Sequence, residues 1–415
     1  MTEQRVPQKV LDLPGQHVDR THLVDRVFFG FGTLASVWLA WELARASFGV
    51  SWWRLLLLVV FWLVLAYLTL PRLNRILSSI YVPDYFIGRT RTSDGLLGDP
   101  LNLAFRGTGA QLSAAMHRGG WIMADPVDLA SSVRIVASTV TGRSYAEAPV
   151  SPLMLFGRPQ DAAFQQEVAG NPAQRHHVRV WRTPPGWLLP GGHRVDWLAG
   201  GTYDRRVGLS LFTLQITHKI DADIDVERDF IVASLREAEP SATVEPLVDF
   251  TTGYHSRNGG GDTVHTDGTL PVVDLTSVAP MPGPDPLADR SDEPRQAPFQ
   301  VLLPAILTIL IGPLALLNAL LQLDSSSSRP DRALLYAVAA LAAVSVVCAI
   351  RMLGRSAWGR RWLLLLSSLI VVVDLVAYEL GGAKDLSAVY HAGVMILVVL
   401  ALSSPAATAW CRRTA

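Results

Sequence analysis

Six long runs of apolar residues alternate with polar segments along the chain. Two come first, at 27–48 and 53–70. The other four follow a long polar region and occupy 300–323, 333–353, 361–380 and 387–410. About 20 helical residues cross a hydrocarbon core of ~30 Å, so each run predicts a transmembrane helix. The pattern therefore predicts a helical hairpin at 27–70, a polar domain, and four further helices at 300–410.

The composition supports a membrane protein. Half of the 415 residues are apolar and only 17% are charged, which lies outside the usual range of soluble domains. The polar tail at 1–26 mixes acids, bases and prolines, unlike a cleavable signal peptide. The formal net charge is zero and no long basic run occurs, so we expect no nucleic-acid partner. The only cysteines, Cys348 and Cys411, lie in or beside apolar runs, which excludes a disulfide framework and fits a reducing compartment.

Basic residues beside the predicted spans indicate the orientation. An even number of spans places both termini, including the basic tail at 411–415, on the side of the polar domain. The short flanks on that side hold Arg5, Lys9, Arg20, Arg26, Arg72, Arg75, Arg351, Arg355, Arg360, Arg361, Arg412 and Arg413, and those on the other side hold Arg45, Arg54, Arg329, Arg332 and Lys384. The positive-inside rule then predicts a multi-pass membrane protein with a cytoplasmic domain and cytoplasmic termini.

The polar region divides into a domain at 71–275 and a linker at 276–299. The linker is rich in proline and poor in apolar residues, especially at 279–298, so we expect it to be extended and mobile. Within the domain, Thr108 and Gln111 have the spacing of a capping box before a helix that ends at Gly119-Gly120. Asp125-Pro126 predicts a second helix start.

A third helix is predicted from Asp223–Asp225 onward, with Phe230, Ile231 and Leu235 on it. Strand candidates lie at 101–105, 176–182, 194–202 and 209–220, and a hairpin turn is expected at 258–262. Because helices and strands are mixed rather than strictly alternating, the predicted fold is α+β with a mixed, largely antiparallel sheet.

Several stretches of the polar region resemble one family, the LssY C-terminal domain of bacterial membrane proteins. They are DPLNLAF (99–105), Gly-Gly-Trp (119–121), APVSPLMLFGRPQDAAFQ (148–165), RHHVRVWRTP (175–184), GGTYDRRVGLS (200–210), THKIDADIDVERDFIV (217–232) and NGGGDTVHTDG (258–268). Related domains are fused to DedA-type proteins or to type 2 phosphatidic acid phosphatases, so the resemblance implies work on lipids or the cell envelope. The motif series of those phosphatases is absent from this sequence, and their chemistry is not carried over. Lys219 stands where relatives more often have histidine.

Strand periodicity places the candidate histidines. In 209–220 His218 shares a face with Phe212, Leu214 and Ile216, so it is expected to point into the core. His176 shares the apolar face of its strand, and His177 takes the other face. A pocket of His176 and His218 with Asp204 would suit a divalent metal or acid–base chemistry. The alternative is that such histidines are hydrogen-bonded core residues.

Charged residues give a second set of candidates. Asp204-Arg205, Asp221 and Arg228-Asp229 cluster around a strand end and a helix start, and Arg179 lies on a neighbouring strand. Arginine can grip a phosphate or another anion, so Arg179, Arg205 and Arg228 are candidate anion ligands. Structural salt bridges and helix caps are the competing explanation. The glycine run at 258–261 lacks the ending of a nucleotide P-loop and is expected to form a turn.

Two ionisable residues fall inside predicted spans. Asp374 in the fifth and His391 in the sixth are expected to meet at similar depth. Unpaired, such a group costs about 3 kcal/mol, so a proton or ion role and a structural bond between helices are the two explanations. Glu42 and Arg45, near a span end, are expected to form a snorkelling pair.

Three functions remain open. The first is a binding or scaffolding module with membrane lipid, an anionic ligand or a protein as partner. The second is a hydrolase of a phosphorylated or lipid-type substrate that uses His176, His177, Asp204, Arg205 and His218, with a divalent metal as the implied cofactor. The third is a small proton- or ion-coupled transporter centred on Asp374 and His391.

Overall fold

A computed structural model describes residues 20–48, 52–81, 86–92, 95–125, 150–168, 171–251, 257–288, 297–325, 329–380 and 386–411. The chain forms two compact units. The helical unit comprises residues 1–69 and 291–415, and the α+β unit comprises residues 70–290.

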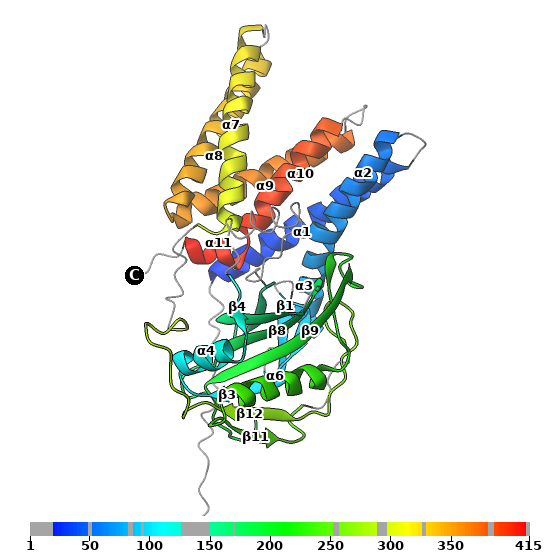
Figure 1. The fold of residues 1–415 in the computed structure, drawn as a ribbon. Coiled ribbons are helices and arrows are strands. Elements are labelled where there is room, and N and C mark those ends of the chain that lie inside the picture. Colours follow the sequence, from blue (N-terminus) through cyan, green and yellow to red (C-terminus); the bar gives the residue numbers. More distant parts are fainter. Residues whose placement is uncertain are drawn as a thin grey trace, which may run out of the picture. The chain divides into compact units, whose positions relative to one another are not determined.

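All six predicted apolar segments are helical. The elements of the helical unit are α1 (Arg20–Ser47), α2 (Trp52–Leu63), the π-helix η2 (Val64–Thr69), α7 (Phe299–Ser325), α8 (Arg329–Leu353), α9 (Ala357–Leu380), α10 (Leu386–Leu402) and α11 (Pro405–Trp410). Helices α7 and α8 run side by side as a hairpin (Figure 1). Short connections between successive long helices favour such antiparallel neighbours.

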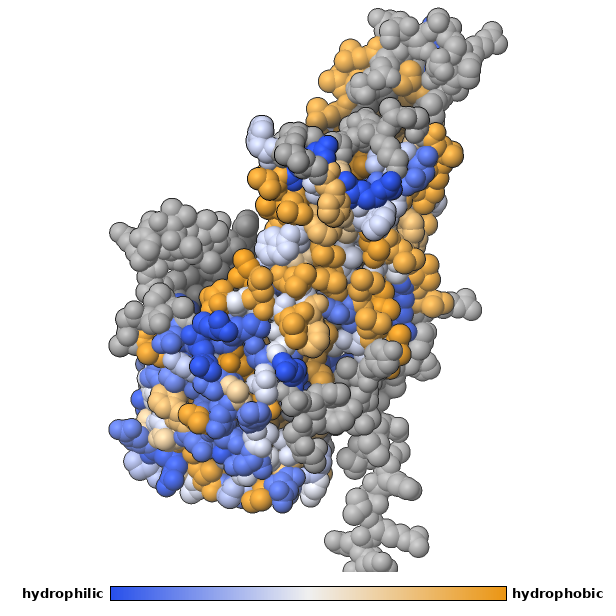
Figure 2. Space-filling view, turned by 90° about the vertical axis from the view of Figure 1, so that its right-hand side faces the viewer, coloured by the Kyte–Doolittle hydropathy of each residue, from blue (hydrophilic) through white to orange (hydrophobic). Residues whose placement is uncertain are grey.

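Four helical stretches are long and apolar enough to cross a membrane. They are Leu23–Ser47, Arg54–Ile80, Leu335–Leu353 and Ala357–Leu380. The stretches Phe299–Leu314 and Val389–Leu402 are apolar but shorter. Large apolar side chains on these helices are exposed, such as Leu56, Leu310 and Leu369, and the helices carry a mostly hydrophobic, orange surface in Figure 2. Helices that are apolar on their outer faces belong in hydrocarbon, so the helical unit indicates a membrane protein.

Two helix boundaries differ from the sequence prediction. The second apolar helix does not end at Leu70, because η2 leads directly into α3 (Leu70–Tyr81). The wide turn of η2 lies just before Pro71, whose ring and missing N–H disrupt an ordinary helix. The last apolar segment divides into α10 and α11, because Ser404 caps a new helix with Pro405 in its first turn.

The α+β unit contains two sheets. Its elements after α3 are β1 (Arg89–Thr92), β2 (Leu97–Pro100), β3 (Leu103–Arg106), α4 (Gly109–Arg118), β4 (Ile122–Met123), β5 (Leu153–Leu155), β6 (Arg158–Pro159), β7 (Ala162–Val168), β8 (Asn171–Arg182), β9 (Trp197–Leu209), β10 (Ile216–Ile220), α6 (Ile224–Ala238), β11 (Thr243–Leu247) and β12 (Leu270–Asp274). The large sheet has the order β11-β12-β3-β9-β8-β7-β4, with β10 also paired to β9, and the small sheet has the order β2-β1-β5-β6. Only the β12–β3 pairing is parallel among the strands that the structure describes. The predicted α+β class with a mixed, largely antiparallel sheet is confirmed.

The large sheet is buried on both faces. Helices α4 and α6 cover one face, where Leu112 and Ile231 pack against Val178 and Val180 of β8. The opposite face packs Trp181 of β8 with residues of β3, β5 and β9. Strand β8 therefore has no solvent-facing side along this stretch, whereas the sequence analysis assigned the core to one side of it.

The predicted helix starts agree with the structure where it describes them. Thr108 and Gln111 form the capping box of α4, and Gly119 is its C-cap. Asp223 caps α6 by accepting a hydrogen bond from the backbone N–H of Asp225. The second predicted helix, after Asp125, falls at 126–149, outside the described residues.

Two other segments differ from the prediction. Residues 210–215 form the turn between β9 and β10, so the predicted strand at 209–220 is wrong in its first half. Part of the predicted mobile linker, 276–288, packs on the α+β unit through Val278 and Leu287, which are both buried. These two apolar side chains explain the packing, because they add to the core beside α4.

Candidate functional site

Strands β8 and β9 carry the histidines that the sequence singled out. His176 and His177 are successive residues of β8, so their side chains point to opposite faces of the sheet. His176 pairs with Tyr203 of β9, and His177 pairs with Thr202. The two histidines therefore belong to different clusters.

His176 lies in an aromatic surrounding beside Glu227 of α6. Its Nδ1 is 2.7 Å from Oε2 of Glu227, and its ring contacts those of Phe230, Tyr203 and Trp121. Burial raises the pKa of Glu227, and the hydrogen bond with His176 opposes this only in part. The other oxygen, Oε1, has no hydrogen-bond partner among the residues that the structure describes. The pair can share one proton, which is the chemistry of an acid–base dyad.

His177 and His218 share Asp204. Nε2 of His177 is 2.9 Å from Oδ2 of Asp204, and Nδ1 of His218 is 3.5 Å from the same oxygen. Burial pushes the pKa of Asp204 upward, but the hydrogen bond from His177 and the nearby positive charges outweigh burial, so the pKa is lowered. An ionised carboxylate only accepts hydrogen bonds, so Nε2 of His177 is the donor. Nδ1 of His177 is buried without a partner in the described part of the chain.

The predicted pocket of His176 and His218 is corrected by this geometry. His218 is 52% exposed rather than buried, because the turn at 210–215 changes the pairing of β10. His177, which was assigned to the other face, is the histidine that joins Asp204 and His218. Within the described ranges, no group of three or more His, Cys, Asp and Glu residues could hold a metal ion.

The three candidate anion ligands contact carboxylates of the chain itself. Arg179 lies 3.0 Å from Asp99, and both side chains are largely buried. Arg205 lies 3.6 Å from Asp221 at the surface. These contacts match the structural salt bridges that the sequence analysis weighed against anion binding.

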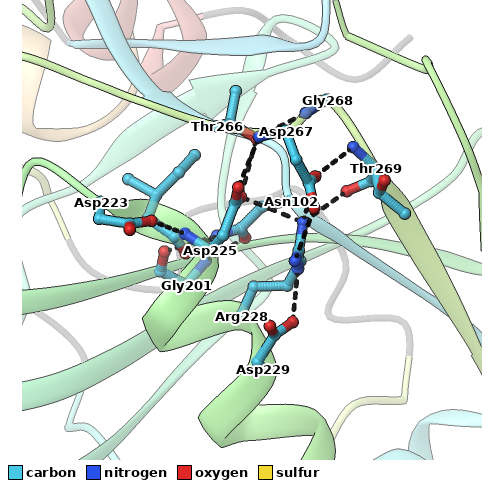
Figure 3. Close-up of polar contacts among 11 residues, drawn as sticks. Asn102, Gly201, Asp223, Asp225, Arg228, Asp229, Thr266, Asp267, Gly268 and Thr269 are labelled. Atoms are coloured by element: carbon cyan, nitrogen blue, oxygen red, sulfur yellow. Dashed lines mark hydrogen bonds and ion pairs between the residues drawn. The ribbon is translucent and has the colours of Figure 1, made fainter.

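Arg228 is the centre of a larger polar network. Figure 3 shows its guanidinium extending from α6 toward the loop before β12, with hydrogen bonds to Asp267, Asp225, Asp229 and the carbonyl of Thr269. The bond from Arg228 lowers the pKa of Asp267 to about 2, and the carboxylates raise the pKa of Arg228. Asp225 also accepts from Thr266 and from the backbone N–H of Asp267. The network ties the start of α6 to this loop.

Lys219 and the glycine run form another structural contact. Nζ of Lys219 donates to the carbonyl of Gly260 at 2.6 Å and lies 3.0 Å from Asp262. The predicted turn at 258–262 is confirmed by the bridge between Arg257 and Thr263. Lys219 therefore holds the turn in this chain.

In the helical unit, the predicted meeting of Asp374 and His391 occurs. Nδ1 of His391 is 2.8 Å from Oδ2 of Asp374, joining α9 to α10. Glu42 and Arg45 form the predicted pair at 3.2 Å. Glu42 is itself buried and accepts a hydrogen bond from Tyr378 of α9, so it also links two helices.

The sequence did not predict two of these buried polar contacts, the Asp25–Arg360 ion pair and the contact of Glu227 with His176. Asp25 of α1 and Arg360 of α9 form a buried ion pair with two N–O contacts, at 2.9 and 3.3 Å, and Thr408 also donates to Asp25. The sequence placed both residues in polar flanks, and the signal available was their position beside apolar runs. Glu227 was missed because its partner His176 is 51 residues away, although its place on the first turn of α6 was visible.

Comparison with known proteins adds one match. No curated protein and no solved structure matches the chain significantly. The family model described as LssY C-terminus matches residues 79–270, which covers both sheets except most of β12, both histidine–carboxylate pairs and the Arg228 network. The resemblance found in the sequence is thereby confirmed, and residues 79–270 match the LssY C-terminus family.

Proposed function

We propose that the protein is a multi-pass protein of the bacterial inner membrane that presents its LssY C-terminal domain to the cytoplasm as a binding or scaffolding module. Apolar helices precede and follow the domain in the chain, which supports anchoring at both of its ends. The excess of arginine on the flanks that share its side supports the cytoplasmic orientation. Membrane lipid is the partner implied by such anchoring, and an anionic ligand or a protein are further candidates.

The observation that favours binding over catalysis is the internal pairing of the candidate residues. His176 pairs with Glu227, His177 with Asp204, and Arg179 with Asp99. Side chains held in this way stabilise a fixed surface, and they are already engaged by partners within the domain. The domain would then act by binding a partner at its surface.

Single-cysteine labelling tests this topology in the full chain. Val248 is 69% exposed in the α+β unit, and the native cysteines, both buried, are first replaced by alanine. We expect Val248→Cys to react with a membrane-impermeant maleimide in inside-out vesicles and not in intact cells. Labelling in intact cells would refute the cytoplasmic orientation, and loss of the protein to the soluble fraction would refute the membrane anchor.

A hydrolase is the second candidate, and one observation favours it. Oγ1 of Thr202 and Nδ1 of His177 are buried, lack partners among the described residues, and belong to directly paired positions of β9 and β8. A hydroxyl, an imidazole and Asp204 in this order have the residue types of a nucleophile–base–carboxylate triad. Release of p-nitrophenol from phosphate or acyl esters, lost in both Thr202→Val and His177→Gln, would support this reaction. Equal release by both variants and the parent protein would refute it.

A proton-coupled transporter is the third candidate, because Asp374 and His391 form a pair between two predicted spans. Ionisable groups within spans commonly mark ion pathways. We would expect Asp374→Asn to abolish proton flux in proteoliposomes that the parent protein supports. The same flux in parent and variant would leave the pair with a structural role.

A further inference from the structure

The turn between β9 and β10 exposes an unusual set of large apolar side chains. They are Val207, Leu209, Leu211, Phe212, Leu214 and Ile216, each between 37% and 63% exposed. We call residues 207–216 the apolar hairpin tip. Soluble proteins expose scattered apolar residues, but six within ten consecutive residues form a concentrated surface that needs a covering environment.

Several backbone N–H groups of the tip are paired within the α+β unit. The N–H of Ser210 donates to the carbonyl of Gln215, that of Leu214 to the carbonyl of Ser210, and that of Thr213 to Oγ of Ser210. Oγ of Ser210 in turn donates to the carbonyl of Gly259. Exposed backbone donors are costly in an apolar environment, so the pairing of these donors suits the turn to contact with hydrocarbon.

The glycine run holds the tip in one conformation. The N–H of Leu211 donates to the carbonyl of Gly260. A Cβ on Gly261, which has φ +82°, would lie 2.4 Å from Cβ of Leu211, so only glycine permits this close approach. Because the tip is already ordered, it would lose little conformational entropy on binding.

The position of the tip along the chain indicates its partner. The side chain of Asn74 on α3 donates to the carbonyl of Phe212 at 3.1 Å. Helix α3 directly continues the apolar helix at 52–69, and Arg72, Asn74 and Arg75 are the first charged or amide side chains after the apolar stretch 55–70. The tip is therefore tied to the polar part of the helix that continues this apolar stretch.

Basic residues flank the tip. Arg205 and Arg206 precede it on β9, and both are exposed. Apolar side chains next to arginines are typical of segments that lie at the headgroup boundary, where anionic lipids attract the charges.

We propose that the apolar hairpin tip inserts into the boundary between headgroups and acyl chains of the bilayer that the protein spans. This inference rests on the proposed membrane anchoring. It gives the LssY C-terminal domain a second attachment to the membrane, which fixes its orientation at the lipid surface.

Fluorescence of the full chain in nanodiscs of phosphatidylethanolamine and phosphatidylglycerol tests the insertion. Leu211→Cys and Leu209→Cys, each in a background with Cys348→Ala and Cys411→Ala, carry an environment-sensitive nitrobenzoxadiazole label. We expect blue-shifted emission, loss of quenching by aqueous iodide, and quenching by lipids that carry doxyl groups. Val248→Cys, exposed on the same unit directly after β11, is the matched control and should show full iodide quenching.

The possible results distinguish whether water, lipid or protein surrounds the apolar hairpin tip. If the labels at 209 and 211 behave like the label at 248, the tip lies in water and the inference is refuted. If they are shielded from both iodide and doxyl lipids, a protein surface or a second copy covers the tip, which also refutes it. A label at Leu369→Cys reports on anchoring separately, because doxyl quenching at 369 without quenching at 211 would leave the membrane anchor intact.

Discussion

The two units place their large apolar side chains in opposite ways. In the helical unit, large apolar side chains such as Leu310 and Leu369 face outward, and the buried charges of Asp25 and Arg360 are paired between helices. In the α+β unit, residues such as Trp181 and Ile231 are completely buried, and charged side chains are paired in the interior, as in Arg179 with Asp99, and nearer the surface around Arg228. The difference indicates that one unit is built for hydrocarbon and the other for water.

The comparison also identifies the exception in each unit. The apolar hairpin tip is the part of the α+β unit that looks like the helical unit, and it is attached to α3, the continuation of a span. In the helical unit, the exceptions are polar pairs between helices, such as Asp374 with His391. The hairpin tip contacts the helix that continues a predicted span, and the polar pair joins two helices.

The largest expected effect comes from breaking the buried ion pair of the helical unit. Arg360→Leu leaves Asp25 buried without its partner, which should lower the free energy of unfolding by about 3–5 kcal/mol. Unfolding of the full chain in mixed micelles by sodium dodecyl sulfate measures this. The neighbouring Arg361 is exposed, so Arg361→Leu is the control and should change little. Equal effects of the two substitutions would show that the pair is not structural.

A core substitution tests the opposite rule in the α+β unit. Ile231→Ala removes a fully buried side chain of α6 and should lower the free energy of unfolding by about 2–5 kcal/mol. Val226→Ala, at an exposed position of the same helix, should change it by less than about 0.5 kcal/mol. Urea unfolding of the full chain in detergent, followed by near-ultraviolet circular dichroism, distinguishes them. A larger loss for Val226→Ala would place the wrong face of α6 against the sheet.

The Arg228 network should contribute less, because it is partly open to solvent. Arg228→Met should lower the free energy of unfolding by about 1–2 kcal/mol at neutral pH. The pKa of Asp267 is depressed to about 2, below the value of about 3.9 expected when unfolded. Its contribution is thus present above pH ~4 and is lost as the pH falls toward 2.

The loss of this contribution at low pH gives a second test of the Arg228 network. Asp267 is 54% exposed, so solvent screening should limit its share to below about 1 kcal/mol. The stability curves of the parent protein and Arg228→Met, measured by urea unfolding between pH 5 and 2, should converge as the pH falls. Curves that stay parallel over that range would exclude the Arg228–Asp267 bond as the cause.

The smallest effect is expected at the apolar hairpin tip. Leu211→Ser and Phe212→Ser alter exposed side chains, so each should change the free energy of unfolding in detergent by less than about 0.5 kcal/mol. The same urea titration measures it. A loss comparable to that of Ile231→Ala would mean that the tip is part of the core and is not a surface for lipid.

The sequence predicted the fold class and most element positions, because these depend on local patterns. Apolar length identified the helices, and the capping boxes and turn residues located α4, α6 and the glycine turn. The turn at 210–215 was missed because Leu211, Phe212 and Leu214 read as strand residues and no Gly, Pro, Asn or Asp marks the turn. Their alternation normally reports burial, and here the side chains are exposed instead.

The candidate site was predicted in its residue types and only partly in its geometry. Asp374 with His391 could be paired because depth in a span follows from position along a helix. His176 and His177 could be assigned to opposite faces, but their partners depend on which strands and helices become neighbours. Glu227 and Asp204 reach the histidines through tertiary packing, which one sequence does not specify.

One experiment tests most directly whether the helical unit lies in hydrocarbon and the α+β unit in water. It compares two side chains that are both exposed in the structure. Leu369 of α9 is 53% exposed and Val248 of the α+β unit is 69% exposed. In a cysteine-free background, we expect Val248→Cys to react with a membrane-impermeant maleimide in open membrane fragments, and Leu369→Cys to react only after the membrane is dissolved and the chain unfolded. Equal reactivity of the two cysteines in intact membrane fragments would contradict the account.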